Sequence, residues 1–244
     1  MLKFLKNVKT NGVKISFGDF GEMVDFETGL DEFSKIGADL SIGDLNVVEG
    51  ERFFLKYRYP EKLQPEFEVA NGTLVVKTRP EIKISVSEDF PKEAFLTISV
   101  PVGTRLEDVR LEDSMGNVTV SKVSSVKLNV EDSMGDINVN EASFSLVDIA
   151  DSMGKINVTD IKADELKGSS SMGGSVIDAC DIAKIKWESS MGKVNLRGTF
   201  GSLDIENSMG DIIVDGESSW TGTLETSMGK VVVDGVKHGD SYSR

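Results

Sequence analysis

The sequence is poor in the side chains on which many enzymes and secreted proteins depend. Its one cysteine, Cys180, excludes an internal disulfide framework. Its one histidine, His238, follows the last repeat, and a lone terminal histidine supports neither a Ser-His-Asp triad nor a histidine-based metal site. No apolar run approaches the roughly 18 residues of a membrane-spanning helix. We therefore expect no direct membrane span.

Acidic residues outnumber basic ones: the sequence has 27 Lys and Arg against 41 Asp and Glu, and its formal net charge is -14. A phosphate backbone is bound by clustered Lys and Arg, so this balance argues against nucleic acid as a partner. The first nine residues are too short and too often interrupted by lysine to form a secretory signal. The chain as written is therefore expected in the cytoplasm, or in the envelope if an exported N-terminus has been lost.

The sequence does have a short repeat. The triplet Ser-Met-Gly occurs seven times, at intervals of 19, 19, 19, 19, 18 and 19 residues, with its serines at Ser114, Ser133, Ser152, Ser171, Ser190, Ser208 and Ser227. A fixed short period indicates units that cannot bury their apolar side alone and that stack on their neighbours.

Aligning the repeats on the serine gives columns that predict strands. In the second repeat the apolar columns are occupied by Leu128, Val130, Met134, Ile137 and Val139, and similar residues occupy them in the other repeats. Within each arm these positions are two apart, which is typical of a strand with one buried face. The alternation breaks at the triplet, so a tight corner is expected there, with glycine supplying the backbone freedom.

These units predict an all-β fold, a single-stranded right-handed parallel β-solenoid with 19-residue rungs. Equivalent strands of successive rungs pair at about 4.8 Å, and parallel crossovers are almost always right-handed. We expect one continuous domain, with irregular N-terminal rungs and a capping hairpin in residues 1–105, seven regular rungs in 106–235 and a tail in 236–244.

The N-terminal region holds degenerate copies of the repeat. Residues 13–20 and 39–47 follow its pattern, with Phe17 and Ile42 where methionine stands later, so the solenoid is expected to begin near residue 12. Residues 53–59, 82–86 and 95–100 are expected strands, and residues 66–78 a hairpin around Asn71-Gly72. These segments are expected to form larger rungs and to cover one end or flank of the coil.

Three columns of the repeat are candidate binding sites. Each Met is interpreted as core filler rather than as part of a thioether ladder for Cu(I), because Phe17 and Ile42 fill the same place. The residue before each Ser is interpreted as a turn cap rather than a calcium ligand, since short polar acceptors replace aspartate in later rungs: Asp113, Asp132, Asp151, Ser170, Ser189, Asn207 and Thr226. The residue after each Gly alternates in sign and is interpreted as a solvated face with surface charge pairs.

Two single residues are assigned to packing. Cys180 shares its column with Val123, Ala142, Ile161 and Thr199, which indicates a buried small side chain rather than a nucleophile. Trp187 follows Gly168 in its column, so its ring is expected to fill the space that this glycine leaves. We assign no catalytic, cofactor-binding or metal-binding residue and expect no cofactor.

Four stretches carry a family resemblance: residues 133–139 (Ser-Met-Gly-Asp-Ile-Asn-Val), 40–47 (Leu-Ser-Ile-Gly-Asp-Leu-Asn-Val), 59–63 (Tyr-Pro-Glu-Lys-Leu) and 96–101 (Leu-Thr-Ile-Ser-Val-Pro). Over residues 34 to 235 the chain resembles the bacterial β-strand-repeat family called "putative adhesin", to which LiaG-like proteins belong. The family more often has a small polar residue where this chain has Met. The resemblance implies a β-solenoid of unknown biochemical function, often linked to the cell envelope and its stress responses, with no catalytic residues to carry over.

These observations favour a non-enzymatic binding or scaffold protein whose partner is a protein or a cell-envelope component. One alternative is a structural solenoid that assembles end to end, as bactofilins do, and a less favoured one is a carbohydrate-active β-helix enzyme, which needs longer loops around a cleft. Because only seven polar residues follow the final strand, we also expect a homodimer through an exposed C-terminal rung.

Overall fold

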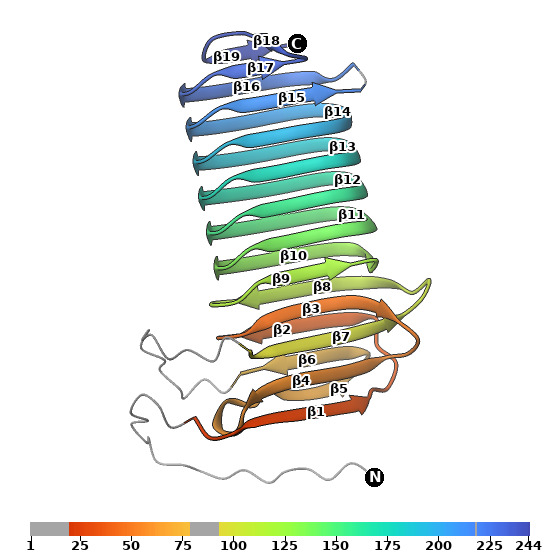
Figure 1. Ribbon diagram of the computed structural model, residues 1–244. Coiled ribbons are helices and arrows are strands. Elements are labelled where there is room, and N and C mark those ends of the chain that lie inside the picture. Colours follow the sequence, from red (N-terminus) through yellow and green to blue (C-terminus); the bar gives the residue numbers. More distant parts are fainter. Residues whose placement is uncertain (1–19, 79–92, 218) are drawn as a thin grey trace.

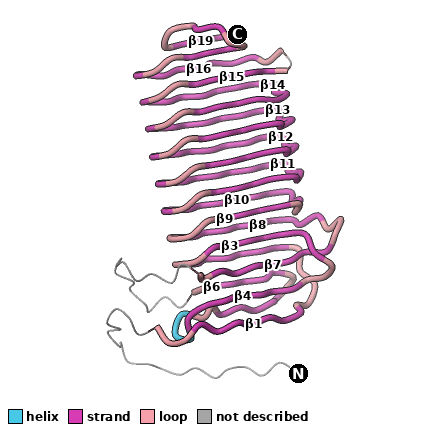
Figure 2. Tube along the Cα trace, viewed as in Figure 1, coloured by secondary structure: helices cyan, strands magenta, loops and turns pink. Residues whose placement is uncertain are grey.

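The computed structural model describes residues 20–78, 93–217 and 219–244, and it is a long ladder of strands wound into a coil (Figure 1). The regular part is built from ten strands: β8 (Arg105–Asp113), β9 (Val118–Ser121), β10 (Ser124–Met134), β11 (Ile137–Met153), β12 (Ile156–Met172), β13 (Ser175–Met191), β14 (Val194–Met209), β15 (Ile212–Gly216), β16 (Thr221–Met228) and β17 (Val231–Val233). The expected parallel β-solenoid is confirmed. The only helical turn in the described part is a 3-10 turn at Glu61–Leu63 (Figure 2).

Each rung pairs in parallel with the next through residues one repeat apart. Val130 lies opposite Ile149, and Ile137 lies opposite Ile156, with the same 19-residue offset. The hydrogen bonds continue through the corner, where the Gly135 amide donates to the Met153 carbonyl at 3.2 Å. The strands before and after each corner therefore form two layers, and the apolar residues between them are the core.

The opposite edge of the coil is a bend inside the long strands. Glu141, Asp160 and Ala179 stand at equivalent places in β11, β12 and β13, each with φ between 52° and 53°. One residue is missing from the next rung, which accounts for the single 18-residue interval. The pairing between β13 and β14 shifts there, so Cys180 lies opposite Gly198, whereas the repeat alignment had placed Thr199 in its column.

The methionine column is the main correction to the sequence interpretation. Met153, Met172 and Met228 are 43%, 42% and 64% exposed, so these side chains lie outside the core. The inward position at the corner belongs to the residue before the serine, such as Asp132, which is 5% exposed. Ile42 is buried, but Tyr59 and Ala94 cover its corner, a cover that the later rungs lack. Phe17 lies outside the described residues.

The exposure of Met153 predicts that its substitution changes the stability of the protein little. We expect Met153→Ala to lower the free energy of unfolding by less than about 1 kcal/mol, because most surface substitutions cost little. Ile149→Ala, four residues earlier and fully buried, is the matched control and should cost about 2 to 5 kcal/mol as a cavity. Urea denaturation of both variants checks the pair, and equal losses would return the methionine to the core.

The N-terminal region has seven strands: β1 (Met23–Gly29), β2 (Lys35–Leu40), β3 (Asp44–Gly50), β4 (Phe54–Pro60), β5 (Glu66–Ala70), β6 (Thr73–Lys77) and β7 (Phe95–Pro101). β6 and β7 stack in parallel on β2 and β3, whereas β1, β4 and β5 pair antiparallel. β2 and β3 stack in parallel on β8 and β9, which confirms a rung around residues 39–47. The hairpin at Asn71-Gly72 and the strands near 53–59 and 95–100 are also confirmed. The expected start near residue 12 and the strand at 82–86 lie outside the described residues.

The C-terminal rung is covered, contrary to the expectation of an open edge. The last residues fold back as β18 (Val236–Lys237), which pairs antiparallel with β17, and β19 (Ser241–Ser243), which pairs antiparallel with β16. The turn uses Asp234 and Gly235, with φ of 48° and 77°. Tyr242 lies against the buried Trp220 with ring centroids 5.8 Å apart. The homodimer through this end of the coil stays a prediction, with β18 and β19 lying on the final rung.

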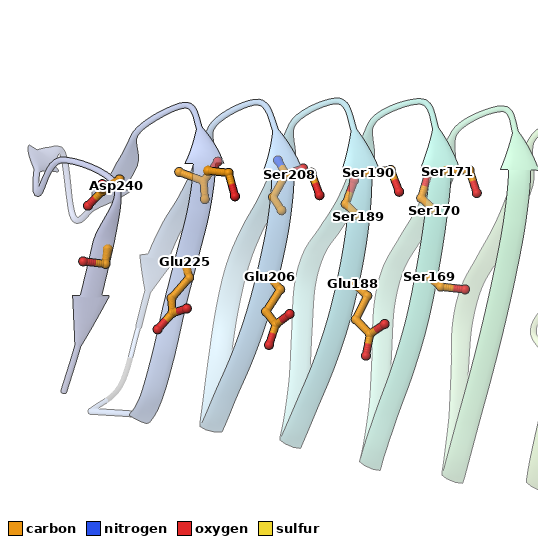
Figure 3. A pocket seen from close by; sticks show the side chains of 14 residues that line it. Ser169, Ser170, Ser171, Glu188, Ser189, Ser190, Glu206, Ser208, Glu225 and Asp240 are labelled. Atoms are coloured by element: carbon orange, nitrogen blue, oxygen red, sulfur yellow. The ribbon is translucent and has the colours of Figure 1, made fainter.

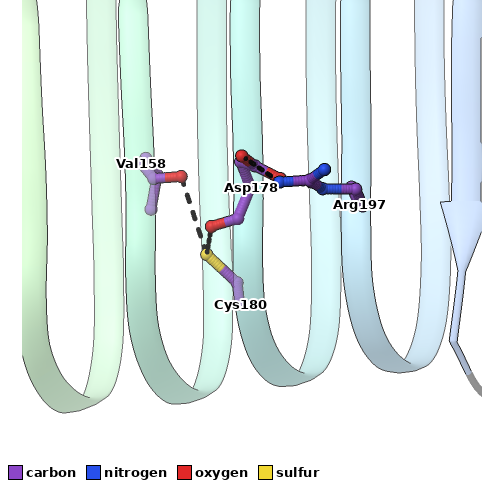
Figure 4. Close-up of polar contacts among 4 residues, drawn as sticks. All are labelled: Val158, Asp178, Cys180 and Arg197. Atoms are coloured by element: carbon purple, nitrogen blue, oxygen red, sulfur yellow. Dashed lines mark hydrogen bonds and ion pairs between the residues drawn. The ribbon is translucent and has the colours of Figure 1, made fainter.

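The packing of Trp187 and Cys180 agrees with the interpretation from the sequence. Trp187 is fully buried, and its ring occupies the place where a side chain on Gly168 would project, 2.1 Å from an ideal Cβ. Cys180 is also buried, and its thiol donates to the Asp178 carbonyl at 3.1 Å (Figure 4). Burial raises the pKa of this thiol to about 11, which keeps it protonated and unreactive at neutral pH.

Candidate functional site

The corner edge of the coil is where polar groups repeat most regularly. Each corner places serine and methionine on the outside and the residue before them on the inside. Because corners stack one strand spacing apart, each position forms a straight row along the coil. Three rows therefore lie side by side: an exposed serine row, an exposed methionine row and a buried polar row.

A groove of about 650 Å³ runs along this edge at the C-terminal half of the coil. Glu188, Glu206 and Glu225 lie in one row along it and project in the same direction (Figure 3). Serines of the neighbouring rows and Asp240 of the C-terminal cap complete its lining. The groove is polar, acidic and open to solvent along its length, so it suits an extended ligand with hydrogen-bonding groups or positive charge.

The three aspartates of the buried row cap their corners, as the sequence predicts. The Met134 amide donates to Asp132 Oδ1 at 3.2 Å, and the Met153 amide donates to Asp151 Oδ1 at 3.1 Å. In the first rung the Ser114 amide donates to Asp113 at 2.9 Å. Side-chain oxygens thus accept from backbone amides that the corner would otherwise leave unpaired.

The last two rungs use the same position as a donor, whereas Ser170 Oγ and Ser189 Oγ have no partner within the described residues. Asn207 Nδ2 donates to the Gly192 carbonyl of the preceding corner, and Thr226 Oγ1 donates to the Gly210 carbonyl, both at 2.9 Å. The second oxygen of each aspartate, Oδ2, is buried and has no partner within the described residues. A carboxylate cannot donate a hydrogen bond, whereas a protonated carboxyl group can donate as Asn207 and Thr226 do.

The electrostatics of the row favour the protonated form. Burial, strengthened by the charge of Asp132, raises the pKa of Asp113 to about 8. Burial likewise raises the pKa of Asp132 and of Asp151 to about 6, with Asp136 contributing to both and Asp132 to the latter. The cause is the same in the three rungs, since a buried carboxylate loses its hydration and faces like charges above or below.

The interpretation of the aspartate row as turn caps rather than calcium ligands leads to a prediction about added metal ions. The described residues contain no group of three or more His, Cys, Asp or Glu placed to hold a metal ion. We expect EDTA to leave the melting temperature unchanged, because each aspartate already caps its own corner. A scan with EDTA, then with millimolar calcium, checks this, and a calcium-dependent rise of several degrees would restore the calcium interpretation.

The residues after each glycine are exposed or half-buried, and three of them accept hydrogen bonds from the backbone of the next corner. Asp136 Oδ1 accepts from the backbone amide of Lys155 at 2.8 Å, and Asp211 Oδ1 accepts from that of Lys230 at 3.1 Å. Asn117 does the same for the Asp136 amide. These contacts tie each corner to the next through the backbone, in place of the surface charge pairs that the alternating signs had suggested.

The remaining single residues form no catalytic arrangement in the described part of the chain. His238 lies in the C-terminal cap, with its ring 4.3 Å from the ring of Tyr242. Asp178 forms an ion pair with Arg197, 2.7 Å from the guanidinium Nη2, on the surface beside the buried Cys180 (Figure 4). Among the described residues no helix has the length and apolar character to cross a membrane.

Comparison with known proteins gives a consistent picture. The profile of the Toastrack DUF4097 family matches residues 34–237. A putative adhesin from Parabacteroides merdae ATCC 43184 has a TM-score of 0.53 at 16% identity, over 87% of this chain and 96% of that one. A putative adhesin from Bacteroides fragilis NCTC 9343 has a TM-score of 0.51 at 18% identity, with the same coverage.

A third solved structure carries a different name. It is a putative lipid binding protein from Parabacteroides distasonis ATCC 8503, with a TM-score of 0.53 at 19% identity over 88% of this chain and 96% of that one. At these identities the likeness extends to the fold alone. A search of curated protein sequences gives no significant match.

Proposed function

Because the chain belongs to the Toastrack DUF4097 family, we propose that it is a non-enzymatic binding or scaffold module that takes its ligand along the corner edge. The observation that carries this proposal is the acidic groove lined by Glu188, Glu206 and Glu225. Strand pairing sets the spacing of these side chains along the groove, so a ligand with a matching repeat meets polar groups at regular intervals.

The ligand class follows from the lining. Carboxylates and serine hydroxyls repeated at one strand spacing hydrogen-bond best to a long chain that is itself rich in hydroxyl or amide groups. Polysaccharide of the bacterial cell envelope has this chemistry. The proposal includes a location at the cell envelope and a part in its stress response.

End-to-end assembly is not included in the proposal. Filament growth that continues the solenoid stacks a rung of one chain in parallel on a rung of the next. The outermost described strands, β1 and β5 at one end and β18 and β19 at the other, all run antiparallel to their neighbours.

The test is co-sedimentation with insoluble cell-wall polysaccharide. The wild type should sediment with it, and Glu206→Gln with Glu225→Gln in the groove should reduce the bound fraction severalfold. Glu112→Gln with Glu131→Gln is the matched control, because these residues occupy the same row outside the groove. A wild type that stays in solution, or an equal loss in both pairs, would overturn the proposal.

A further inference from the structure

Seven methionines occupy the same place in successive corners, and the six from Met134 to Met228 are paired in register from rung to rung. Met134 lies opposite Met153, Met153 opposite Met172, and the pairing continues to Met228. We call this set the methionine ladder: Met115, Met134, Met153, Met172, Met191, Met209 and Met228. Six of the seven are exposed, by 36% to 64%.

Close packing between corners explains the glycine of each corner but not the methionine. A side chain on Gly135 or Gly154 would overlap the backbone of the preceding rung, at 1.7 and 1.6 Å from its carbonyl oxygen. The methionine meets no such limit, since it projects into solvent. An exposed strand position accepts many residues, and the row after each glycine does vary, among Asn, Asp, Lys and Gly. Methionine nevertheless stands in all seven corners.

A thioether differs from other apolar side chains in its chemistry. Sulfur is soft and polarisable, and thioether ligands select soft ions such as Cu(I). Cβ atoms of adjacent ladder residues are about one strand spacing apart, roughly 4.8 Å. Flexible methionine side chains from neighbouring rungs can therefore bring two or three sulfurs onto one ion.

We propose that the methionine ladder is a binding site for a soft monovalent cation, Cu(I) or Ag(I), held by thioethers of adjacent rungs. The net charge of -14 favours a cation at this surface and disfavours an anionic membrane. The repeat makes the site multiple, so the chain binds more than one ion. This inference is independent of the groove and extends beyond the proposed function.

The direct test follows methionine methyl groups by NMR in protein labelled with ¹³C at those methyls. Ag(I), which needs no reductant, is added first, and Cu(I) kept reduced with ascorbate is added second. A Cys180→Ala background removes the competing thiol. The methyl signals of the ladder should shift with each ion, whereas those of Met1 and Met23, which lie outside the ladder, should stay in place.

A variant separates thioether binding from simple apolar exposure. Met134→Leu, Met153→Leu and Met172→Leu together keep the volume and apolar character but remove three adjacent sulfurs. Competition with a chromophoric Cu(I) chelator should show at least a tenfold weaker affinity at this end of the ladder and fewer ions bound. Methyl signals that ignore excess Ag(I), or a leucine variant that binds as the wild type does, would overturn the proposal. If the leucine variant misfolds, the wild-type titration decides alone.

Discussion

Gly154→Ala is expected to destabilise the array severely. An ideal Cβ on Gly154 would lie 1.6 Å from the carbonyl oxygen of Gly135 and 3.0 Å from Asp151 Oδ2. The Gly135 backbone cannot retreat, because its own amide is bonded to the Met153 carbonyl in the next rung. We expect a loss of more than about 4 kcal/mol in the free energy of unfolding, at the severe end of single substitutions. Circular dichroism melting measures it.

Gly37→Ala is the matched control for this prediction. Gly37 lies in β2 between two paired strands, but nothing lies within 4 Å of its ideal Cβ. Alanine there should be neutral or slightly stabilising, because it reduces the freedom of the unfolded chain. If Gly154→Ala melts within a few degrees of the wild type, the corners do not approach as closely as the structure has them.

Replacing Asp113, Asp132 and Asp151 together by asparagine is expected to stabilise the protein in alkaline solution. Asparagine keeps the acceptor that caps the corner and supplies the donor seen at Asn207. Its side chain carries no charge to bury. At pH 9 the triple variant should exceed the wild type by about 3 kcal/mol or more, given about 1.4 kcal/mol for each unit of pKa difference. Denaturant unfolding from pH 5 to pH 9 measures the difference.

The direction follows from the raised pKa of each group. An aspartate with an ordinary unfolded pKa of about 3.9 binds protons more tightly in this fold, so its stabilising contribution is complete below that pH. The contribution is lost as pH rises through about 6 for Asp132 and Asp151 and about 8 for Asp113. The wild type should weaken over this window and the variant should not.

A second triple variant controls for net charge. Asp148, Asp164 and Asp181 are exposed aspartates of the same array, and changing them to asparagine removes the same formal charge. This control should retain the pH dependence of the wild type. Equal flattening in both variants would mean that general repulsion, and not the buried row, sets the pH response.

The sequence predicts the fold well because its strongest signals are local and repeated. Alternation in stretches such as Leu128 to Val130 specifies strands, and the fixed interval specifies parallel stacking. The Asn71-Gly72 hairpin is a direct turn signal. The Asp234-Gly235 dipeptide is the same kind of signal, and it marks the turn that folds the tail onto the last rung.

Polarity alone does not predict which residue of the corner points into the core. Methionine is usually buried and aspartate usually exposed, so the residue types favour the wrong assignment at Asp132 and Met134. The alternation of buried positions at Leu128 and Val130 continues to Asp132, and this alternation is the sequence signal that places Asp132 inside. An inward carboxyl group is tolerated because the tight corner places backbone donors and carbonyls around it, a property of three-dimensional geometry.

The measurement that tests the account most directly is the rate of methionine oxidation in the folded protein. Dilute hydrogen peroxide followed by mass spectrometry of peptides gives a rate for each corner. With Met outward and the preceding residue inward, the six exposed ladder methionines should oxidise at rates close to that of a free methionine peptide, while the protein stays folded. Ladder methionines that resist oxidation until the protein is denatured would contradict the account.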